Sequence, residues 1–170
     1  MRDETVTFFN EKNVTDPAIL RELDAACEIV VLSRDERLPM PEDRAFILLD
    51  GTLRGWLLDR EGNEVTDDFI FKRGQGFADF CAGREGDAVE FFDAVTPCRV
   101  LSMNRVQVDE LAKRDPALAT IQITTVREMY LRIWEHRNAI ITLDARGRYL
   151  WFLERYPGLI DTVYHKYISS

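Results

Sequence analysis

The sequence has 170 residues, a formal net charge of −8 and a hydrophobic share of 46%. This length and this share are ordinary for one globular domain with a buried core, or for a domain with an appended segment. The acidic balance argues against loose, charge-driven binding to the phosphate backbone of nucleic acids, although it leaves room for a local basic face.

The sequence has three cysteines, which lie far apart, at positions 27, 81 and 98. They form no C-x-x-C pair and no cluster with His136 or His165, so we expect reduced thiols in small apolar core positions. No apolar run has the length of a signal peptide or of a membrane span. A cytoplasmic protein without membrane contact is therefore expected.

Residues 14–27 carry the pattern of a helix. Asp16 suits the cap, Pro17 suits the first turn, and Leu20 and Leu23 recur on one face. The apolar run EIVVLS that follows predicts a strand.

Residues 45–104 consist of short apolar runs separated by turn residues. In the segment LLDREGNEV, residues 59–63 predict a hairpin turn in which Gly62 adopts a positive φ. The segments DAVEFFDAV and CRVLSM predict further strands. Many short strands at regular spacing indicate a β-sandwich or a barrel.

A long helix is predicted over residues 115–142, with Asp115 as its cap and Pro116 in its first turn. Apolar residues follow in alternating steps of four and three, the spacing of a coiled-coil seam that Arg137 interrupts. The seam comprises Ala119, Ile123, Val126, Tyr130, Ile133, Arg137 and Ile140. A second apolar set is expected to pack against the β domain: Leu118, Met129, Leu131 and Trp134.

The seam has two alternative uses. It could pack on the chain's own sheet, or it could pair with the same helix of a second copy. We favour self-pairing, because the helix is apolar on more than one face and a small β domain covers only part of it. Glu128 and Arg132, one turn apart, are expected to form an ion pair on this helix.

The segment LDARGRYLWFLERYP predicts another helix, capped by Asp144 or Thr142, with Leu150 and Leu153 on one side. Pro157 and Gly158 end this helix, and a further helix is predicted to begin near Tyr164.

This order of elements resembles the CRP/FNR family of bacterial transcription regulators. FILLDGTLRGWLLDREGNEVTDDFIFKRGQ is similar to the family's central hairpin, with Gly51 at its turn. TPCRVLSMNRVQVDELAKRDPAL is similar to the last strand and the run into the long helix, and LDARGRYLWFLERYP to the start of the winged helix-turn-helix.

The resemblance implies an α+β fold in three parts. A double-stranded β-helix (jelly-roll) sensor domain with an N-terminal helix spans residues 1–114, a long dimerisation helix spans residues 115–142, and an incomplete winged helix-turn-helix domain begins at residue 143. It also implies a homodimer that binds DNA through a recognition helix expected beyond Ser170. We therefore expect that residues 1–170 alone do not bind a specific DNA sequence. Whether the chain is one piece of a longer protein stays open.

The resemblance also places the effector pocket. Its candidate residues are Gly51, Asp79, Phe80, Ala88, Val89, Ile133 and Trp134. Where cyclic-nucleotide binders carry Arg with Ser or Thr for the phosphate, this chain has Ala88 and Val89, followed by the acidic Glu90. Cyclic AMP is therefore not the expected ligand.

Two alternatives for the pocket stay open. Its own aromatic side chains could close it, or it could bind an apolar or aromatic effector. We favour the closed pocket, because clustered aromatic residues more often form a core than a receptor site. The aromatic residues concerned are Phe77, Phe80, Phe91, Phe92 and Trp134.

No enzyme or cofactor signature is found. Both histidines lie outside the β region, so a metal site of the cupin type is not expected, and His136 is expected to be solvated. Asp67 and Asp68 are expected on opposite faces of a strand at a solvated edge. The predicted function is an effector-responsive regulator without catalytic activity; the alternative is a stand-alone sensory module that acts through protein partners.

Overall fold

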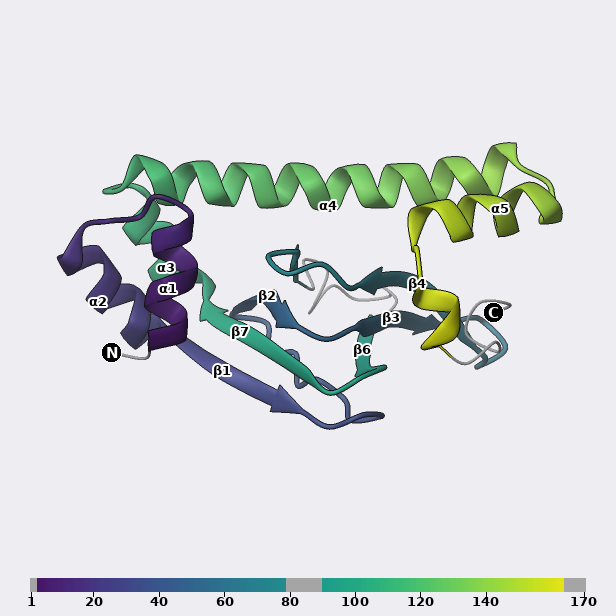
Figure 1. Ribbon diagram of the computed structural model, residues 1–170, viewed down its shortest axis with the longest axis horizontal. Coiled ribbons are helices and arrows are strands. Elements are labelled where there is room, and N and C mark those ends of the chain that lie inside the picture. The colour runs from purple at the N-terminus through teal and green to yellow at the C-terminus, as the bar shows by residue number, and fades with distance from the viewer. Residues whose placement is uncertain (1–2, 79–89, 164–170) are drawn as a thin grey trace.

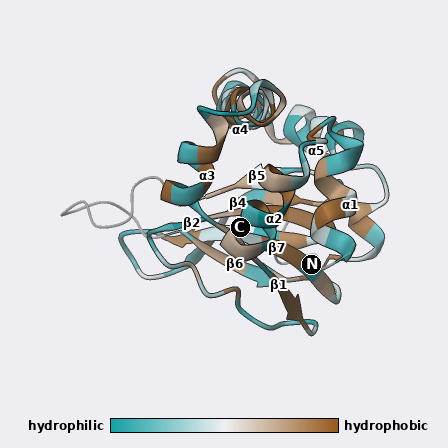
Figure 2. Ribbon diagram, turned by 90° about the vertical axis from the view of Figure 1, so that its left-hand side faces the viewer, coloured by the Kyte–Doolittle hydropathy of each residue, from teal (hydrophilic) through white to brown (hydrophobic). Residues whose placement is uncertain are grey.

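A computed structural model of the chain describes residues 3–78 and 90–163 (Figure 1). In these ranges two antiparallel sheets share a core between them, a cluster of short helices covers one end, and one long helix runs above both sheets along the molecule (Figure 1). Figure 2, which looks along the long helix, shows α4 above the sheets and α5 beside it.

The helical end is formed by segments from both halves of the chain. They are α1 (Asp3–Glu11), α2 (Pro17–Ala26) and α3 (Arg105–Ala112). The predicted cap of α2 is confirmed, because an oxygen of Asp16 accepts a hydrogen bond from the Ala18 amide at 2.7 Å. Helices α1 and α3 were not predicted.

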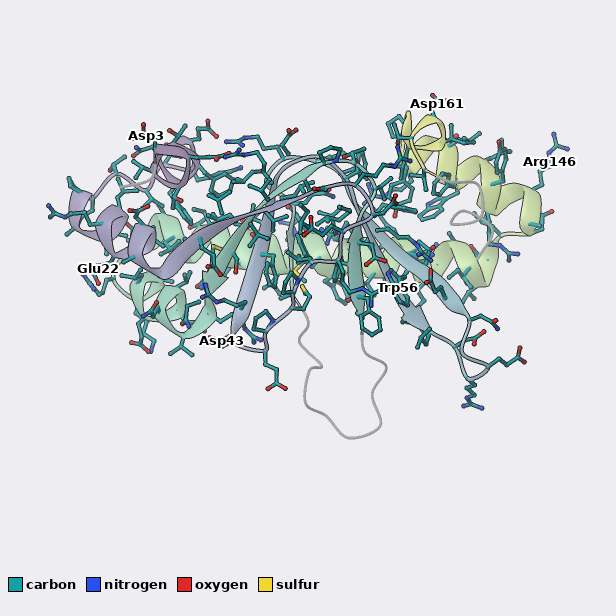
Figure 3. All side chains as sticks on the ribbon, turned by 90° about the horizontal axis from the view of Figure 1, so that it is seen from below. Asp3, Glu22, Asp43, Trp56, Arg146 and Asp161 are labelled. Atoms are coloured by element: carbon teal, nitrogen blue, oxygen red, sulfur yellow. The ribbon has the colours of Figure 1, made fainter. Side chains whose placement is uncertain are left out.

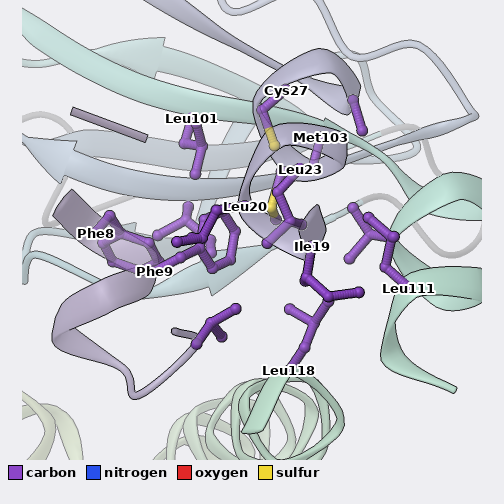
Figure 4. Close-up of a cluster of buried hydrophobic side chains, with 14 of the residues drawn as sticks. Phe8, Phe9, Ile19, Leu20, Leu23, Cys27, Leu101, Met103, Leu111 and Leu118 are labelled. Carbon is purple, nitrogen blue, oxygen red and sulfur yellow. The ribbon is translucent and has the colours of Figure 1, made fainter. Parts of the chain in front are cut away.

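These helices bury one core against the sheet (Figure 4). Phe8 and Phe9 of α1, Leu23 of α2 and Leu101 of the sheet are almost completely buried in it. Leu118, in the first turn of the long helix, reaches the same core (Figure 4). The start of the long helix is therefore fixed to the helical end.

The strands form two sheets, and every pair of neighbouring strands in them is antiparallel. The four-stranded sheet has the order β1 (Cys27–Leu32), β7 (Cys98–Asn104), β2 (Arg44–Asp50) and β5 (Gly76–Phe77). The three-stranded sheet has the order β4 (Glu64–Ile70), β3 (Leu53–Leu58) and β6 (Phe91–Ala94). The predicted strands after residue 27 and around residues 91–104 are confirmed.

The predicted hairpin joins β3 to β4. The amide of Asp59 donates to the carbonyl of Asn63 at 2.9 Å, and Gly62 has a φ of +85°. Further along the hairpin, Gly55 pairs with Asp68 but Trp56 pairs with Thr66, which leaves residue 67 as an extra residue. This β-bulge interrupts the strict alternation of side chains along β4.

The long helix α4 (Pro116–Thr142) has the predicted bounds. An oxygen of Asp115 accepts from the Leu118 amide at 2.9 Å, which confirms the predicted cap. Its 27 residues span about 40 Å at 1.5 Å per residue. Figure 3, the view from below, shows α4 behind the sheets along the length of the molecule.

The segment after α4 turns back beneath it (Figure 1). It contains α5 (Ala145–Arg155) and the 3₁₀ helix η1 (Leu159–Asp161). Asp144, one of the two predicted caps, accepts from the Gly147 amide at 2.7 Å. On the side predicted to carry Leu150 and Leu153, Leu150 is exposed and Leu153 is half-buried; the buried residue of this helix is Phe152. The helix predicted near Tyr164 lies outside the described residues.

Candidate functional site

The outer face of α4 presents an apolar stripe to solvent. Its residues are Ile123, Val126, Tyr130, Ile133, Trp134, Ile140 and Ile141. The side chains of Ile123 and Tyr130 are 71% and 64% exposed, so the predicted seam does not pack on the chain's own sheet. Of the two other seam positions, Arg137 is exposed and Ala119 is half-buried.

The second apolar set on α4 was predicted correctly only in part. Leu118 is buried and Met129 is half-buried, as expected. Leu131 and Trp134, in contrast, are 41% and 49% exposed and do not pack against the β domain. The reason is geometric, because a straight helix turns only one face toward the sheets, and these two residues lie outside that face.

A buried cation fixes the middle of α4 to both sheets. Nε of Arg132 donates to Oδ2 of Asp68 on β4 at 2.9 Å, and Nη2 donates to the carbonyl of Gly76 on β5 at 3.0 Å. Arg132 is therefore paired across elements, and the predicted pair with Glu128 was wrong. Removing one partner of such a buried pair typically costs about 3–5 kcal/mol, because the other charge is left uncompensated.

A second polar contact lies one turn further along α4. Nδ1 of His136 is 4.0 Å from Oδ1 of Asp67, and its ring stacks on Trp151 of α5 with centroids 5.8 Å apart. Burial raises the pKa of Asp67. The expectation that Asp67 and Asp68 lie on opposite faces was wrong, because the bulge in β4 lets both meet α4. The expected solvation holds in part: the Asp67 side chain is 46% exposed, whereas that of His136 is 27% exposed.

The segment after α4 docks on β4 through a hydrophobic cluster with three aromatic residues. The cluster comprises Phe69, Val95, Phe152, Tyr156, Leu159 and Val163. The Tyr156 hydroxyl lies 3.4 Å from Oδ1 of Asp68, and burial together with the charge of Asp68 raises its pKa. Arg155 adds an ion pair with Glu135 of α4 at 3.0 Å. Sequence reasoning missed this site; its available signal was the recurrence of aromatic residues in β4 and α5.

The predicted effector residues are not brought together by the described part of the chain. Gly51 forms the turn between β2 and β3 with a φ of +91°, where a Cβ atom would lie 2.3 Å from the carbonyl of Pro97. It is thus a turn residue packed against the backbone. Ile133 and Trp134 lie on the exposed stripe of α4. The remaining candidates, Asp79, Phe80, Ala88 and Val89, lie outside the described residues.

The expected aromatic closure is found only in part. Phe77 packs against Phe46 and Phe92 in the core between the sheets, with ring centroids 5.5 and 4.8 Å away. Phe91 instead stacks on Trp56 at 4.6 Å. Trp134 takes no part, because it is exposed on α4. Phe80 lies outside the described residues.

The cysteines Cys27 and Cys98 are buried, unbridged thiols. Burial raises the pKa of Cys98, which keeps it in the unreactive thiol form at neutral pH. Over residues 3–78 and 90–163, no group of three or more His, Cys, Asp or Glu side chains is placed to hold a metal ion. None of the described helices combines the length and apolarity needed to cross a membrane.

Sequence comparison gives no relative: no protein-family model matches the chain, and no curated protein matches it. Comparison with solved structures, in contrast, gives many matches. A protein from Eubacterium rectale described as a transcriptional regulator of the CRP/FNR family matches with a TM-score of 0.70 and 13% identity, over 92% of this chain and 76% of its own.

Two further solved structures match in the same way. FixK2 from Bradyrhizobium japonicum has a TM-score of 0.61 and 17% identity, over 76% of this chain and 65% of its own. A cyclic nucleotide-binding domain containing protein from Listeria monocytogenes has a TM-score of 0.61 and 9% identity, over 81% of this chain and 63% of its own. This chain thus spans less than two thirds of the length of either. Identities this low show the fold alone. The chain has an α+β fold whose antiparallel sheets resemble the cyclic-nucleotide-binding domain of CRP/FNR regulators.

Proposed function

We propose that this protein is an effector-responsive transcription regulator of the CRP/FNR type that works as a homodimer. In this proposal residues 1–114 form a jelly-roll sensor domain, residues 115–142 pair with the same helix of a second copy, and residue 143 begins the DNA-binding part. The observation that carries the proposal is the apolar stripe on α4, exposed along a helix whose opposite face is fixed to a β domain of this fold.

The stripe fits a second copy of the same helix better than a different partner. Steps of four and three residues match the seam of a two-stranded coiled coil, and a two-fold axis makes one stripe complementary to itself. Burying one exposed side chain such as Ile123 or Ile133 contributes about 1.5–3 kcal/mol. Several such residues along about 40 Å of helix suffice for a stable pair.

Cyclic AMP is not the proposed effector. Ala88 and Val89 supply neither a guanidinium group nor a hydroxyl for a cyclic phosphate, and Ile133 and Trp134 supply no hydroxyl for a base. Burying a phosphate without such donors is costly. The proposed sensor domain therefore responds to a ligand of different chemistry.

The test uses the complete product of the gene that encodes this chain. Light scattering should find a dimer, and DNA footprinting against a random library should select a site with two related halves. Ile133→Glu, in the centre of the stripe, should give monomers and abolish the footprint, because two carboxylates cannot be buried face to face. Leu131→Glu is the matched control, since Leu131 is exposed on α4 outside the stripe.

The outcomes separate the two predicted functions. A dimer that selects no DNA sequence would favour the stand-alone module that acts through protein partners. Wild-type protein that stays monomeric at high micromolar concentration would refute the proposed pairing along α4.

A further inference from the structure

His136 lies where three elements of the fold meet, because α5 turns back beneath the end of α4 and beside β4 (Figure 1). Its Nδ1 atom is 4.0 Å from Oδ1 of Asp67 on β4. Its ring lies parallel to the ring of Trp151 on α5, at an interplanar angle of 5°. One imidazole therefore links α4 to the sheet and to the helix that follows.

A proton on this imidazole strengthens both links. An imidazolium ion attracts the carboxylate of Asp67, whereas a neutral ring carries no charge that could do so. The ring centroids of His136 and Trp151 are 5.8 Å apart. This separation lies within the range of about 6 Å over which a cation interacts with the face of an indole ring. Protonation thus adds one favourable interaction with β4 and another with α5.

The charged groups that face the imidazole from β4 are Asp67 and Asp68. Asp68 accepts a hydrogen bond from Arg132 at 2.9 Å and lies 3.4 Å from the Tyr156 hydroxyl. Asp67 instead faces His136: burial raises the pKa of its carboxyl group, and the interaction with His136 lowers it. Asp67 is therefore the carboxylate whose environment depends on the charge of the imidazole.

Helices α4 and α5 add charges of both signs around the imidazole. Glu135, its neighbour on α4, forms an ion pair with Arg155 of α5 at 3.0 Å. Arg137, the neighbour on the other side, is exposed. Arg148 and Glu154, each about one turn from the stacked indole of α5, are exposed as well. Solvent screens the exposed charges, so they oppose or favour the imidazolium only weakly.

A small cavity lies beside the pair of Asp67 and His136. Both residues line it, together with Arg137 and Ile140, and its volume is about 180 Å³. A water molecule takes up about 30 Å³ in the liquid, so the cavity has room for water. The pair is also partly exposed. The imidazole can therefore exchange its proton with water while α5 stays docked.

We propose that His136 is a pH-sensitive switch that holds the C-terminal arm, residues 136–163, against β4. With the imidazole protonated, Asp67 holds the end of α4 to the sheet and the stack with Trp151 holds α5 to α4. With the imidazole neutral, both contacts weaken and the arm detaches more often. The arm keeps its other contacts, so the switch changes the fraction of docked arm and does not unfold the protein.

The sign of the pH dependence follows from which state binds the proton more tightly. Only the docked arm offers the imidazole both contacts, so docking favours the protonated form. The contribution is fully present below about pH 6.5, where a free imidazole titrates, and is lost as the pH rises through the range in which the docked imidazole loses its proton. On the acid side it ends where Asp67 takes up a proton, and burial places this limit above the ordinary aspartate value.

The consequence of the switch for DNA binding rests on the proposed function, whereas the switch itself does not. In the proposed regulator the arm contains the start of the DNA-binding part, so its detachment changes where that part lies. The test below measures the arm alone and uses neither DNA nor a partner.

The test follows amide hydrogen exchange of the full chain by mass spectrometry at about pH 6 and about pH 8, with exchange times scaled to the intrinsic rate at each pH. Protection of residues 145–163 should fall roughly threefold between the lower and the higher pH, the size expected for a partly exposed charge interaction. Protection of α3 and β7, which are remote from the arm, should stay unchanged and serves as the internal reference.

Three variants assign the effect. His136→Gln keeps a polar side chain that takes up no proton in this range, so the protection of α5 should be equal at both pH values. His165→Gln is the matched control, because it removes the second of the two histidines of the chain and should respond to pH as the wild type does. Asp67→Asn should reduce the response, and it keeps the test decisive if His136→Gln fails to fold. Circular dichroism checks each variant.

Four results would overturn the switch. They are equal protection of α5 at both pH values in the wild type, a pH response that survives in His136→Gln, a response that disappears in His165→Gln, and a full response in Asp67→Asn. A loss of protection spread evenly over the arm, α3 and β7 would also overturn it, because it would report global stability. Failure of the switch leaves the DNA footprint and the light scattering untouched, so the two proposals fail independently.

Discussion

Asp67 is a carboxylate that the bulge in β4 places against α4. Burial raises its pKa, the interaction with His136 opposes this rise, and the charge of Asp68 adds to it. The folded protein therefore holds this proton at a higher pH than the unfolded chain does. Ionised Asp67 therefore lowers the free energy of unfolding. This destabilisation is fully present above the folded-state pKa, and it disappears as the pH falls from the folded-state pKa to the unfolded-state pKa.

Asp67→Asn should remove this destabilisation. We expect the free energy of unfolding at pH 7 to rise by about 0.5 kcal/mol or less, because the side chain is nearly half exposed and solvent screens its charge. The gain should vanish at a pH below the ordinary aspartate range. Urea denaturation at both pH values measures it.

Asp59 supplies a control of opposite sign. Hydrogen bonds from Asn63 lower its pKa, so its charged form stabilises the hairpin above the unfolded pKa, and this contribution is lost as the pH falls through the folded value. Asp59→Asn should therefore reduce stability at pH 7 and not in acid. A gain in Asp67→Asn that persists in acid would show that charge is not its cause.

At the scale of the element, α4 combines a fixed inner face with an exposed outer stripe. Arg137 interrupts the outer stripe with a charge that is exposed in the single chain. In a paired helix this residue would lie at the seam, where a polar residue sets the register and reduces the stability of the pair.

Arg137→Leu should therefore strengthen the dimer. We expect the dissociation constant to fall roughly tenfold, about 1.4 kcal/mol, measured by sedimentation equilibrium. Arg127→Leu removes a charge of the same sign from α4 outside the seam and is the control. An unchanged constant in Arg137→Leu would place residue 137 outside the contact between the two helices.

At the scale of the whole molecule, α5 and the residues up to 163 are held against the three-stranded sheet. Phe69 on β4 is the centre of this contact, with its ring 6.0 Å from Phe152 and 5.6 Å from Tyr156 between centroids. The chain joins α4 to α5 through a short turn at Leu143 and Asp144. The position of α5 therefore depends on β4 as well as on α4.

Phe69→Ala should release α5 from the sheet. A core Phe→Ala change costs about 3–5 kcal/mol. This loss should appear as faster amide exchange over residues 145–163, with the centre of α4 still protected. Hydrogen exchange followed by mass spectrometry measures both regions.

Tyr156→Phe is the control, because it keeps the ring and removes only the 3.4 Å contact with Asp68. Its exchange pattern should stay close to that of the wild type. Faster exchange of α4 and α5 together in Phe69→Ala would show that the two helices unfold as one unit.

The sequence by itself determined the elements that depend on neighbours in the chain. Each helix cap is a carboxylate that accepts a hydrogen bond from an amide two or three residues ahead: Asp16, Asp115 and Asp144. The 59–63 turn is likewise closed by a hydrogen bond between its own residues. Local sequence patterns therefore suffice to predict the caps and the turn. The alternating steps along residues 115–142 likewise indicated the exposed stripe.

Only the tertiary structure decided which distant groups meet. The bulge at Asp67, the Arg132–Asp68 pair and the docking of Phe152 all depend on how α4 sits against two sheets that are formed elsewhere in the chain. Sequence periodicity gives the face of a helix, but it gives no distance between that helix and a sheet. The pair of Arg132 was therefore assigned to its own helix.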